Sequence, residues 1–285
     1  MAERDVLVVD DEPKARELLR YIFEAAGYNC LLASDGDEGL EVFRKARPPL
    51  VVTDVLHPGI NGIELLRQVR ALDGDMAVIV LTGAASVKTA IECLKGGAYA
   101  FLLKPPNLDE LLITVERALE RRQLLIEHRE HQQAHGQRQE AQRDVLIVEY
   151  DPAMRRLFHE AFVSWRYTCV LASDGREGLE MFKARRPPLV LADLGRPMTV
   201  GKWVRGEWVS DAGIGLLMEI RQEDPDVAVI ILGWMDVKTY NASLKLGAYA
   251  FLWKPVNLEE LQIVAERALE RRQLLIERRQ RHERA

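Results

Sequence analysis

Five polar residues stand directly after short apolar runs in the first half of the chain, and their types suit phosphoryl chemistry. They are Asp10 and Asp11, then Asp54, Thr82 and Lys104. Three carboxylates in one cleft repel one another unless a cation lies between them, and an all-oxygen site that keeps room for water and a phosphate oxygen suits Mg2+. A hydroxyl and an ammonium group opposite that cation would complete a phosphate clamp. The residue types therefore predict a magnesium-dependent phosphoryl site.

These side chains can converge only if the apolar runs are strands of one sheet. The runs are Val6–Val9, Leu50–Thr53, Val78–Leu81 and Phe101–Leu103. They alternate with stretches of helical period, which favours repeated β-α units and a parallel sheet. Reactive groups in such sheets gather at the carboxyl ends of the strands. We therefore predict a doubly wound α/β fold.

Helix boundaries are also marked in the sequence. Pro13 suits a first helical turn, and Gly27 is placed to end the same helix. Asn107 and Glu110 have the spacing of a capping box, which predicts a further helix start.

An internal duplication organises the chain. Residues Arg4–Pro58 align with Arg143–Pro197 without a gap, and two later segments recur. The recurring segments are GAYAFL at Gly97–Leu102 and Gly247–Leu252, and ERALERRQLLIE at Glu116–Glu127 and Glu266–Glu277. The second copy has an insertion over 198–210 and lacks one residue near Gly233.

The duplication predicts two domains joined by a long helical linker. Residues 1–127 form the first domain with an extended C-terminal helix, 128–142 a polar helical linker, and 143–285 the second domain with its own extended helix. Each extension carries an apolar cluster, Leu124, Leu125 and Ile126 or Leu274, Leu275 and Ile276. We expect these clusters to pair with the other copy or with a second chain, giving a homodimer in the latter case; the alternative is an extension that folds back on its own domain.

Four segments of the first unit together resemble the receiver domain of two-component response regulators. They are VLVVDDE at Val6–Glu12, DVLHPGING at Asp54–Gly62, VIVLTG at Val78–Gly83 and FLLKP at Phe101–Pro105. The resemblance covers both units except the linker and the extended helices. It implies two flavodoxin-like domains and a place in a two-component phosphorelay.

The resemblance also implies a role for each residue of the first site. Asp54 would be the phosphoacceptor; Asp10, Asp11, Asp54 and the Leu56 carbonyl would bind Mg2+; Thr82 and Lys104 would bind phosphoryl oxygens; Phe101 would be the aromatic switch. Phosphorylation would draw Thr82 inward and open space for Phe101. The face carrying the fourth and fifth helices would then change its packing, and a partner could read that change.

The second unit departs from this pattern at the site itself. Glu149 and Tyr150 replace the adjacent acid pair, and only Asp193 and Lys254 survive from the central set. The missing residue is expected to remove the counterpart of the threonine, at Leu232–Gly233. We therefore predict a degenerate receiver that is phosphorylated inefficiently or not at all.

The insertion and the surroundings of Asp54 give two further predictions. Trp203 and Trp208 lie symmetrically about Arg205-Gly206, which predicts a two-residue hairpin. The aromatic pair either simply stabilises this hairpin or forms part of a lid or docking surface.

Leu56 and Ala84 flank the path of an in-line water in the family that the chain resembles. Neither side chain can hold water, so we expect slow autodephosphorylation and no steady turnover.

Composition and charge narrow the functional classes. A net charge of -5 gives no footprint for nucleic acid, and no apolar run approaches the roughly 20 residues that span a bilayer. With no secretory signal pattern at the start, we expect a cytoplasmic protein. No DNA-binding module is recognisable, so the expected partners are a histidine kinase or phosphotransfer protein and a downstream protein target.

Two alternative functions stay open at this point. The chain could be a scaffold or phosphate sink in which the second unit is a constitutive interaction module. A phosphoaspartate-type hydrolase is less compatible, because such an enzyme usually carries a D-x-D nucleophile strand.

Overall fold

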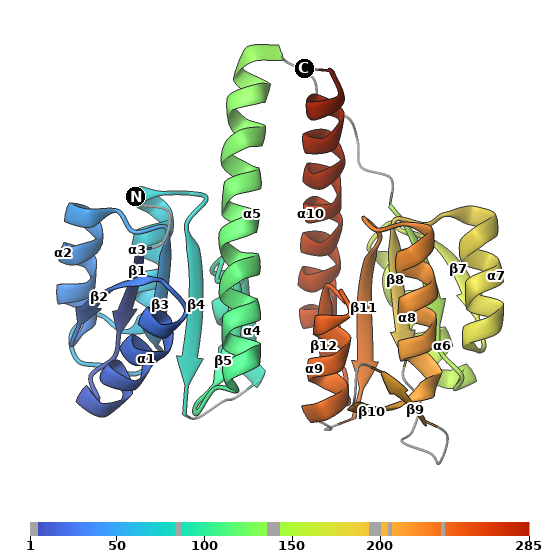
Figure 1. The fold of residues 1–285 in the computed structure, drawn as a ribbon, viewed down its shortest axis with the longest axis horizontal. Helices are drawn as coiled ribbons and strands as arrows, with labels where there is room; N and C mark the ends of the chain where they lie inside the picture. Colours follow the sequence, from blue (N-terminus) through green and yellow to red (C-terminus); the bar gives the residue numbers. More distant parts are fainter. Residues whose placement is uncertain are drawn as a thin grey trace. The chain divides into compact units, whose positions relative to one another are not determined.

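The computed structural model describes residues 5–83, 87–135, 143–193, 201–204, 207–234 and 237–284. The chain divides into two compact units, Met1–Ala134 and His135–Ala285, each with its own parallel sheet (Figure 1). Ala84, the Arg205–Gly206 turn and the predicted linker beyond His135 lie outside the described residues. No helix in the described ranges is long and apolar enough to cross a bilayer.

The first unit is a five-stranded parallel sheet with helices between successive strands. Its elements are β1 (Asp5–Val9), α1 (Pro13–Ala25), β2 (Asn29–Ala33), α2 (Gly36–Ala46), β3 (Leu50–Asp54), α3 (Gly62–Leu72), β4 (Ala77–Thr82), α4 (Val87–Lys95), β5 (Ala100–Leu103) and α5 (Leu108–His135). The strand order is β2-β1-β3-β4-β5. The order reverses between β1 and β3, and in open α/β sheets ligands bind at that point, beyond the carboxyl ends of the strands. The predicted doubly wound fold is confirmed.

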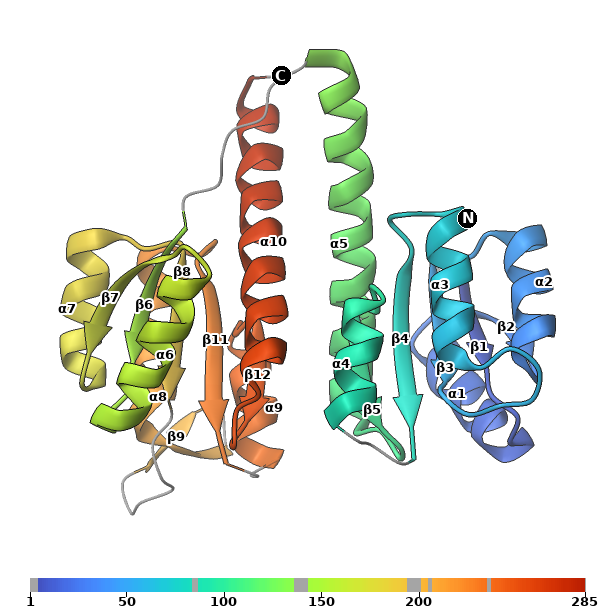
Figure 2. The ribbon, with the colours of Figure 1, turned by 180° about the vertical axis from the view of Figure 1, so that it is seen from behind.

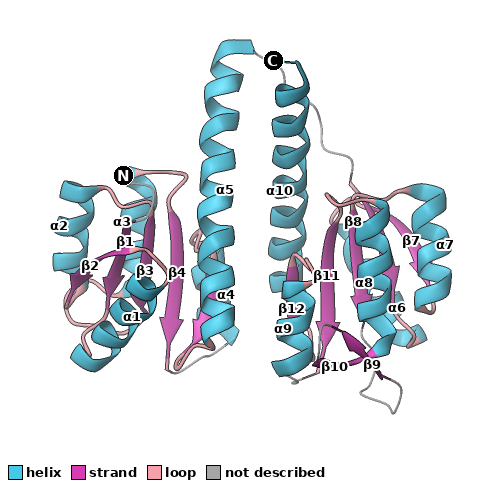
Figure 3. Ribbon diagram, in the orientation of Figure 1, coloured by secondary structure: helices cyan, strands magenta, loops and turns pink. Residues whose placement is uncertain are grey.

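Helices cover both faces of the sheet (Figure 3), and alternate residues of the strands build one core on each face. Val6 and Val8 pack with Phe23 of α1 and with the first turns of α5. Leu7 packs with Phe43 of α2 and with side chains of α3 and α4. Because side chains alternate along a strand, a strand covered on both faces reads as a continuous apolar run.

The predicted helix boundaries are confirmed. Pro13 is the first residue of α1, and Gly27 has a φ of 83° just beyond its end, where glycine adopts a left-handed conformation without strain. The Asn107 side chain accepts a hydrogen bond from the Glu110 N–H at 3.1 Å, at the start of α5.

The second unit repeats this architecture (Figure 2). Its elements are β6 (Asp144–Val148), α6 (Pro152–Ser164), β7 (Thr168–Ala172), α7 (Gly175–Arg185), β8 (Leu189–Asp193), β9 (Gly201–Val204), β10 (Glu207–Ser210), α8 (Asp211–Glu223), β11 (Ala228–Gly233), α9 (Val237–Lys245), β12 (Ala250–Trp253) and α10 (Leu258–Arg284). The main sheet has the order β12-β11-β8-β6-β7. The insertion forms an antiparallel hairpin in which Trp208 pairs with Trp203, as predicted.

Ion pairs connect each long helix to the loop that precedes the fourth strand of its own unit. Arg122 pairs with Asp73 at 2.6 Å, and Arg129 pairs with Asp75. The copies are Arg272 with Asp224 at 3.1 Å and Arg279 with Asp226 at 2.7 Å. In the apolar clusters Leu124 and Leu274 are buried, while the other four side chains are half-buried. Ion pairs therefore fix each extension to its own unit, and the pairing of the apolar clusters stays a prediction.

Candidate functional site

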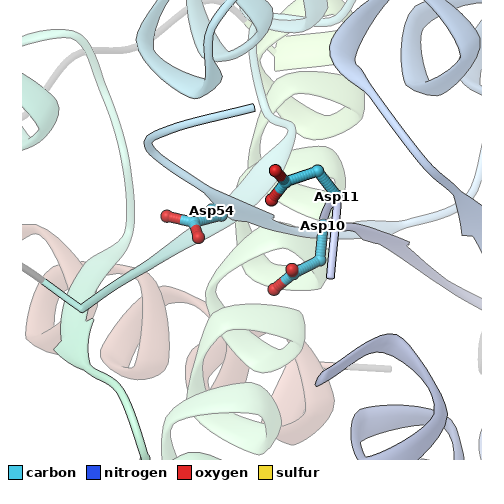
Figure 4. Close-up of side chains that lie close together, drawn as sticks. All are labelled: Asp10, Asp11 and Asp54. Carbon is cyan, nitrogen blue, oxygen red and sulfur yellow. The ribbon is translucent and has the colours of Figure 1, made fainter. Parts of the chain in front are cut away.

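Three carboxylates converge at the carboxyl edge of the first sheet. Val9 pairs with Thr53 in the register of β1 and β3, so Asp10 and Asp54 emerge side by side. Oxygen atoms of Asp10, Asp11 and Asp54 lie within 4.8 Å of one another, and Figure 4 shows the three side chains close together at the ends of β1 and β3. Asp10 is buried and Asp11 is exposed. A hard cation that prefers oxygen ligands and keeps some of its water fits such a half-open group, so Mg2+ suits these residues.

Lys104 supplies a positive charge to the same group. It follows β5, and its Nζ lies 2.5 Å from Asp10 Oδ2 and also hydrogen bonds to Asp54. Burial opposes the charge on this ammonium, but its hydrogen bonds and attraction to Asp10 and Asp54 outweigh burial, so the pKa of Lys104 is raised. The lysine therefore stays protonated at neutral pH.

The remaining residues predicted for the first site also lie at this edge. Thr82 is the last residue of β4 and is buried. The Leu56 N–H donates to Asp54 Oδ1 at 3.2 Å, while the Leu56 side chain is 66% exposed. Phe101, in β5, is half-buried. The first unit thus brings Asp10, Asp11 and Lys104 together around Asp54, with Thr82 at the end of the neighbouring strand.

His57 is held apart from this chemistry by its own contacts. Its Nε2 lies 3.3 Å from the Thr53 hydroxyl, and its Nδ1 lies 3.3 Å from the Pro58 carbonyl oxygen. Both ring nitrogens therefore have protein partners.

A closed ion-pair group occupies the corresponding place in the second unit. Lys254 Nζ lies 3.2 Å from Glu149 Oε2 and 2.8 Å from Asp193 Oδ2. All three side chains are buried; Lys254 is 8% exposed, compared with 19% for Lys104. Among the described residues of the second unit, no three metal-ligating side chains gather as they do around Asp54.

The two residues that follow Glu149 are not suited to bind a metal beside this group. The Asp151 carboxylate caps α6 by accepting the N–H groups of Ala153 and Met154 at 2.8 and 3.0 Å. The Tyr150 ring is exposed, and its centroid lies 6.0 Å from Lys254 Nζ. The Tyr150 ring thus stands at the position of Asp11, and the neighbouring Asp151 carboxylate accepts backbone N–H groups.

The pKa of Glu149 differs from that of an ordinary glutamate. Removal from water, followed by repulsion from Asp193, raises the pKa of Glu149, although the Asp151 N–H and Lys254 act in the opposite direction. Burial also opposes the charge on Lys254, but hydrogen bonds and attraction to Asp193 and Glu149 leave its pKa raised. The lysine stays charged, and Glu149 holds its proton to higher pH than an ordinary glutamate.

Gly233 is the counterpart of Thr82. The Lys104 N–H donates to the Thr82 carbonyl at 2.7 Å, and the Lys254 N–H donates to the Gly233 carbonyl at 2.8 Å. The expectation that the missing residue removes this position is therefore wrong. The missing residue lies after β11, and the position is present but has no hydroxyl. An ungapped comparison of the two fourth strands would have shown this from the sequence.

Two doubly wound α/β units, one of which gathers three carboxylates and a lysine at the carboxyl edge of its sheet, define a class of protein. Comparison with known proteins identifies the family. The model of the response regulator receiver domain matches residues 6–116 and 145–266. The chain belongs to this family and contains two of its domains in tandem.

Curated relatives are similar over part of their length. The C4-dicarboxylate transport transcriptional regulatory protein DctD of Pseudomonas aeruginosa is 41% identical over 139 residues, which is 49% of this chain and 30% of DctD. The response regulator MprA of Mycolicibacterium vanbaalenii is 43% identical over 117 residues, 41% of this chain and 50% of MprA. The chain thus spans at most about half of these relatives.

Solved receiver domains are similar as well. A receiver domain protein from Clostridium thermocellum is 34% identical, with a TM-score of 0.41, and covers 42% of this chain and 98% of its own. The beryllofluoride-activated NtrC4 receiver domain dimer is 35% identical, with a TM-score of 0.41 and the same coverage.

Proposed function

We propose that this chain is a two-component response regulator in which the first receiver domain accepts a phosphoryl group on Asp54 and the second does not. The observation that carries the proposal is the gathering of Asp10, Asp11 and Asp54 around one space with Lys104 beside them. The second unit offers Lys254 between two buried acids in its place.

The chemistry follows from the charges of these groups. A carboxylate is a weak nucleophile, so the incoming phosphoryl group must be positioned and its oxygens neutralised. The Asp54 carboxylate oxygen attacks phosphorus, the bond from phosphorus to the donor imidazole nitrogen breaks, and an acyl phosphate forms. Lys104 balances negative charge on the phosphoryl oxygens, and the Thr82 hydroxyl donates a hydrogen bond to one of them. Mg2+ bound by the three acids would supply further neutralisation.

Incubation with a small phosphodonor tests this proposal. The purified protein is treated with acetyl phosphate and Mg2+, or with acetyl phosphate and EDTA, and its intact mass is measured. We expect one phosphoryl group with Mg2+, none with EDTA, and a modified peptide that contains Asp54. Phosphorylation that is absent with Mg2+, or that is equal on Asp193, would contradict the proposal.

The partners follow from the same function. We infer a phosphohistidine donor, either a histidine kinase or a phosphotransfer protein, a cytoplasmic location and an output by protein contact. The closed ion-pair group around Lys254 favours one additional role, in which the second domain is a constitutive interaction module and the chain acts as a scaffold or phosphate sink.

Self-association through the extended helices is part of this proposal. Leu125, Ile126 and their copies Leu275 and Ile276 are half-buried, and covering an apolar side chain completely contributes about 1.5–3 kcal/mol. Light scattering should show a dimer at micromolar concentration that dissociates when these four residues become serine. Helical content measured by circular dichroism is the control for folding. A monomer in both proteins would remove this part of the proposal.

A further inference from the structure

The aromatic residue at the switch position differs between the two domains. Phe101 pairs with Val80 across β5 and β4, and Phe251 pairs with Ile231 across β12 and β11, so both lie two residues before the strand end. Phe251 is buried, with 7% of its surface exposed, whereas Phe101 is half-buried. The same residue type at the same register is therefore accommodated differently.

Gly233 explains the position of the Phe251 ring. A Cβ added to Gly233 would lie 3.1 and 3.2 Å from Phe251 Cε2 and Cε1, and closer still to Cζ, below the 3.0 Å that real Cβ atoms respect. The ring thus occupies space that a side chain at residue 233 would need. Thr82 has such a side chain, so Phe101 can reach the equivalent space only if Thr82 is withdrawn.

Two further aromatic rings pack against the Phe251 ring. Tyr240 of α9 and Trp253 of β12 lie 5.4 and 4.7 Å from the Phe251 ring centroid, with interplanar angles of 70° and 58°. Tyr240 and Trp253 stack on each other at 5.3 Å and 16°. Edge-to-face and offset ring pairs of this kind are favourable beyond the area they bury. The aligned residues of the first domain, Ala90 and Leu103, have no ring.

We propose that Gly233 and this aromatic cluster lock the second domain in a single switch state, with Phe251 turned inward whether or not any phosphoryl group is present. No side chain at residue 233 has to move to admit the ring. The α9–β12 face is therefore constant, while the matching α4–β5 face of the first domain varies with phosphorylation. This proposal rests on the proposed function in one respect: the first domain, whose state depends on phosphorylation, is the reference with which the second domain is compared.

Fluorine NMR of protein labelled with 4-fluorophenylalanine tests the lock. Phe101→Leu and Phe251→Leu identify the two resonances, and Mg2+ with beryllofluoride is the phosphoryl mimic. We expect the Phe101 resonance to shift on addition of the mimic and the Phe251 resonance to stay in place. A small H2O/D2O solvent isotope shift at Phe251, compared with Phe101, should report its burial in the unmodified protein. A Phe251 resonance that shifts with the mimic, or that is as solvent-sensitive as Phe101, would overturn the lock.

Substitution at residue 233 gives the causal test. Gly233→Ala should move the Phe251 resonance and increase its solvent isotope shift without any mimic. Gly74→Ala is the matched control, because an added Cβ there meets nothing within 4 Å. An unmoved Phe251 resonance in folded Gly233→Ala protein would overturn the role of Gly233. If that variant does not fold, Tyr240→Ala should release the ring instead, and an unmoved Phe251 resonance in that variant would overturn the proposal. If the Phe101 resonance does not shift on addition of the mimic, the proposed function of the first domain is contradicted. The conclusion about Phe251 is unaffected by that result.

Discussion

The two domains keep the same lysine and surround it with different acids. Lys104 is shared by Asp10 and Asp54, with Asp11 exposed beside them, whereas Lys254 is shared by Glu149 and Asp193. The second domain has thus lost the exposed acid and kept the ion pair. Removing one member of such a buried group leaves uncompensated charge, so we expect the loss of any one of them to destabilise the carboxyl edge of the sheet even in the absence of phosphoryl chemistry. The comparison separates what the fold requires from what the reaction requires.

The largest expected difference is in phosphoryl uptake. Asp54→Asn should abolish phosphorylation by acetyl phosphate and Mg2+, because an amide cannot form the acyl phosphate. Asp193→Asn is the matched control and should leave uptake unchanged. Intact mass gives the stoichiometry, and circular dichroism checks that both variants fold. Residual full uptake in Asp54→Asn would place the acceptor elsewhere and break the comparison.

The next difference concerns stability. Lys254→Met leaves Glu149 and Asp193 buried without a cation, and breaking a buried pair in this way typically costs about 3–5 kcal/mol. Lys104→Met should cost less, because its site is more open and Mg2+ can replace the lost charge there. Urea unfolding of the two variants, each with and without Mg2+, measures this. Equal losses, or a rescue of Lys254→Met by Mg2+, would contradict the assignment of a metal site to the first domain alone.

A smaller effect is expected from pH. Since the pKa of Glu149 is raised in the folded state, the folded second domain binds a proton more tightly than the unfolded chain. Glu149 therefore contributes stability that is fully present below the ordinary glutamate pKa and is lost as pH rises through the raised value. Glu149→Gln should flatten this decrease. Thermal unfolding between pH 4 and pH 8 tests the slope, and a variant with the same slope as the parent would show that another group is responsible.

The smallest expected change is in the lifetime of the phosphorylated state. The exposed Leu56 side chain cannot hold a water in line with phosphorus, and both ring nitrogens of His57 already have partners. Leu56→Asn should therefore accelerate hydrolysis, by about tenfold at most, which corresponds to ~1.4 kcal/mol in the barrier. The decay of phosphorylated protein in Mg2+ is the measurement, with Leu56→Val as the control. Decay of the parent at the rate of the asparagine variant would refute water exclusion.

Much of the fold was accessible from the sequence because it is encoded locally. The apolar runs predicted β1, β3, β4 and β5 to within a residue or two, and Pro13 marked the start of α1. The convergence of the acids then followed from parallel strands. The position of Gly233 was missed because the one-residue gap was placed at Gly233 itself; an ungapped comparison of the two fourth strands places the gap after Gly233, and the strand register agrees.

Contacts between distant elements could not be predicted in the same way. The cluster of Tyr240, Phe251 and Trp253 joins a helix to a strand, and the pairing of Arg122 with Asp73 spans 49 residues. Neither has a periodic signal. Such contacts depend on how side chains of different elements meet once the chain has folded.

Two arginine pairs fix α5 to its own unit beyond the turns that pack in the core. At 1.5 Å per residue, its 28 residues extend about 42 Å. Arg122 holds the middle of the helix to Asp73, so a small tilt of the turns beside β5 would be converted into a displacement of the far end in the opposite direction. Arg129 is half-exposed and pairs with Asp75. This ion pair restrains the far part of α5, and salt weakens the restraint by screening the charges. The amplitude of any movement at the tip of α5 should therefore increase with ionic strength, even where the chemistry at Asp54 is unchanged.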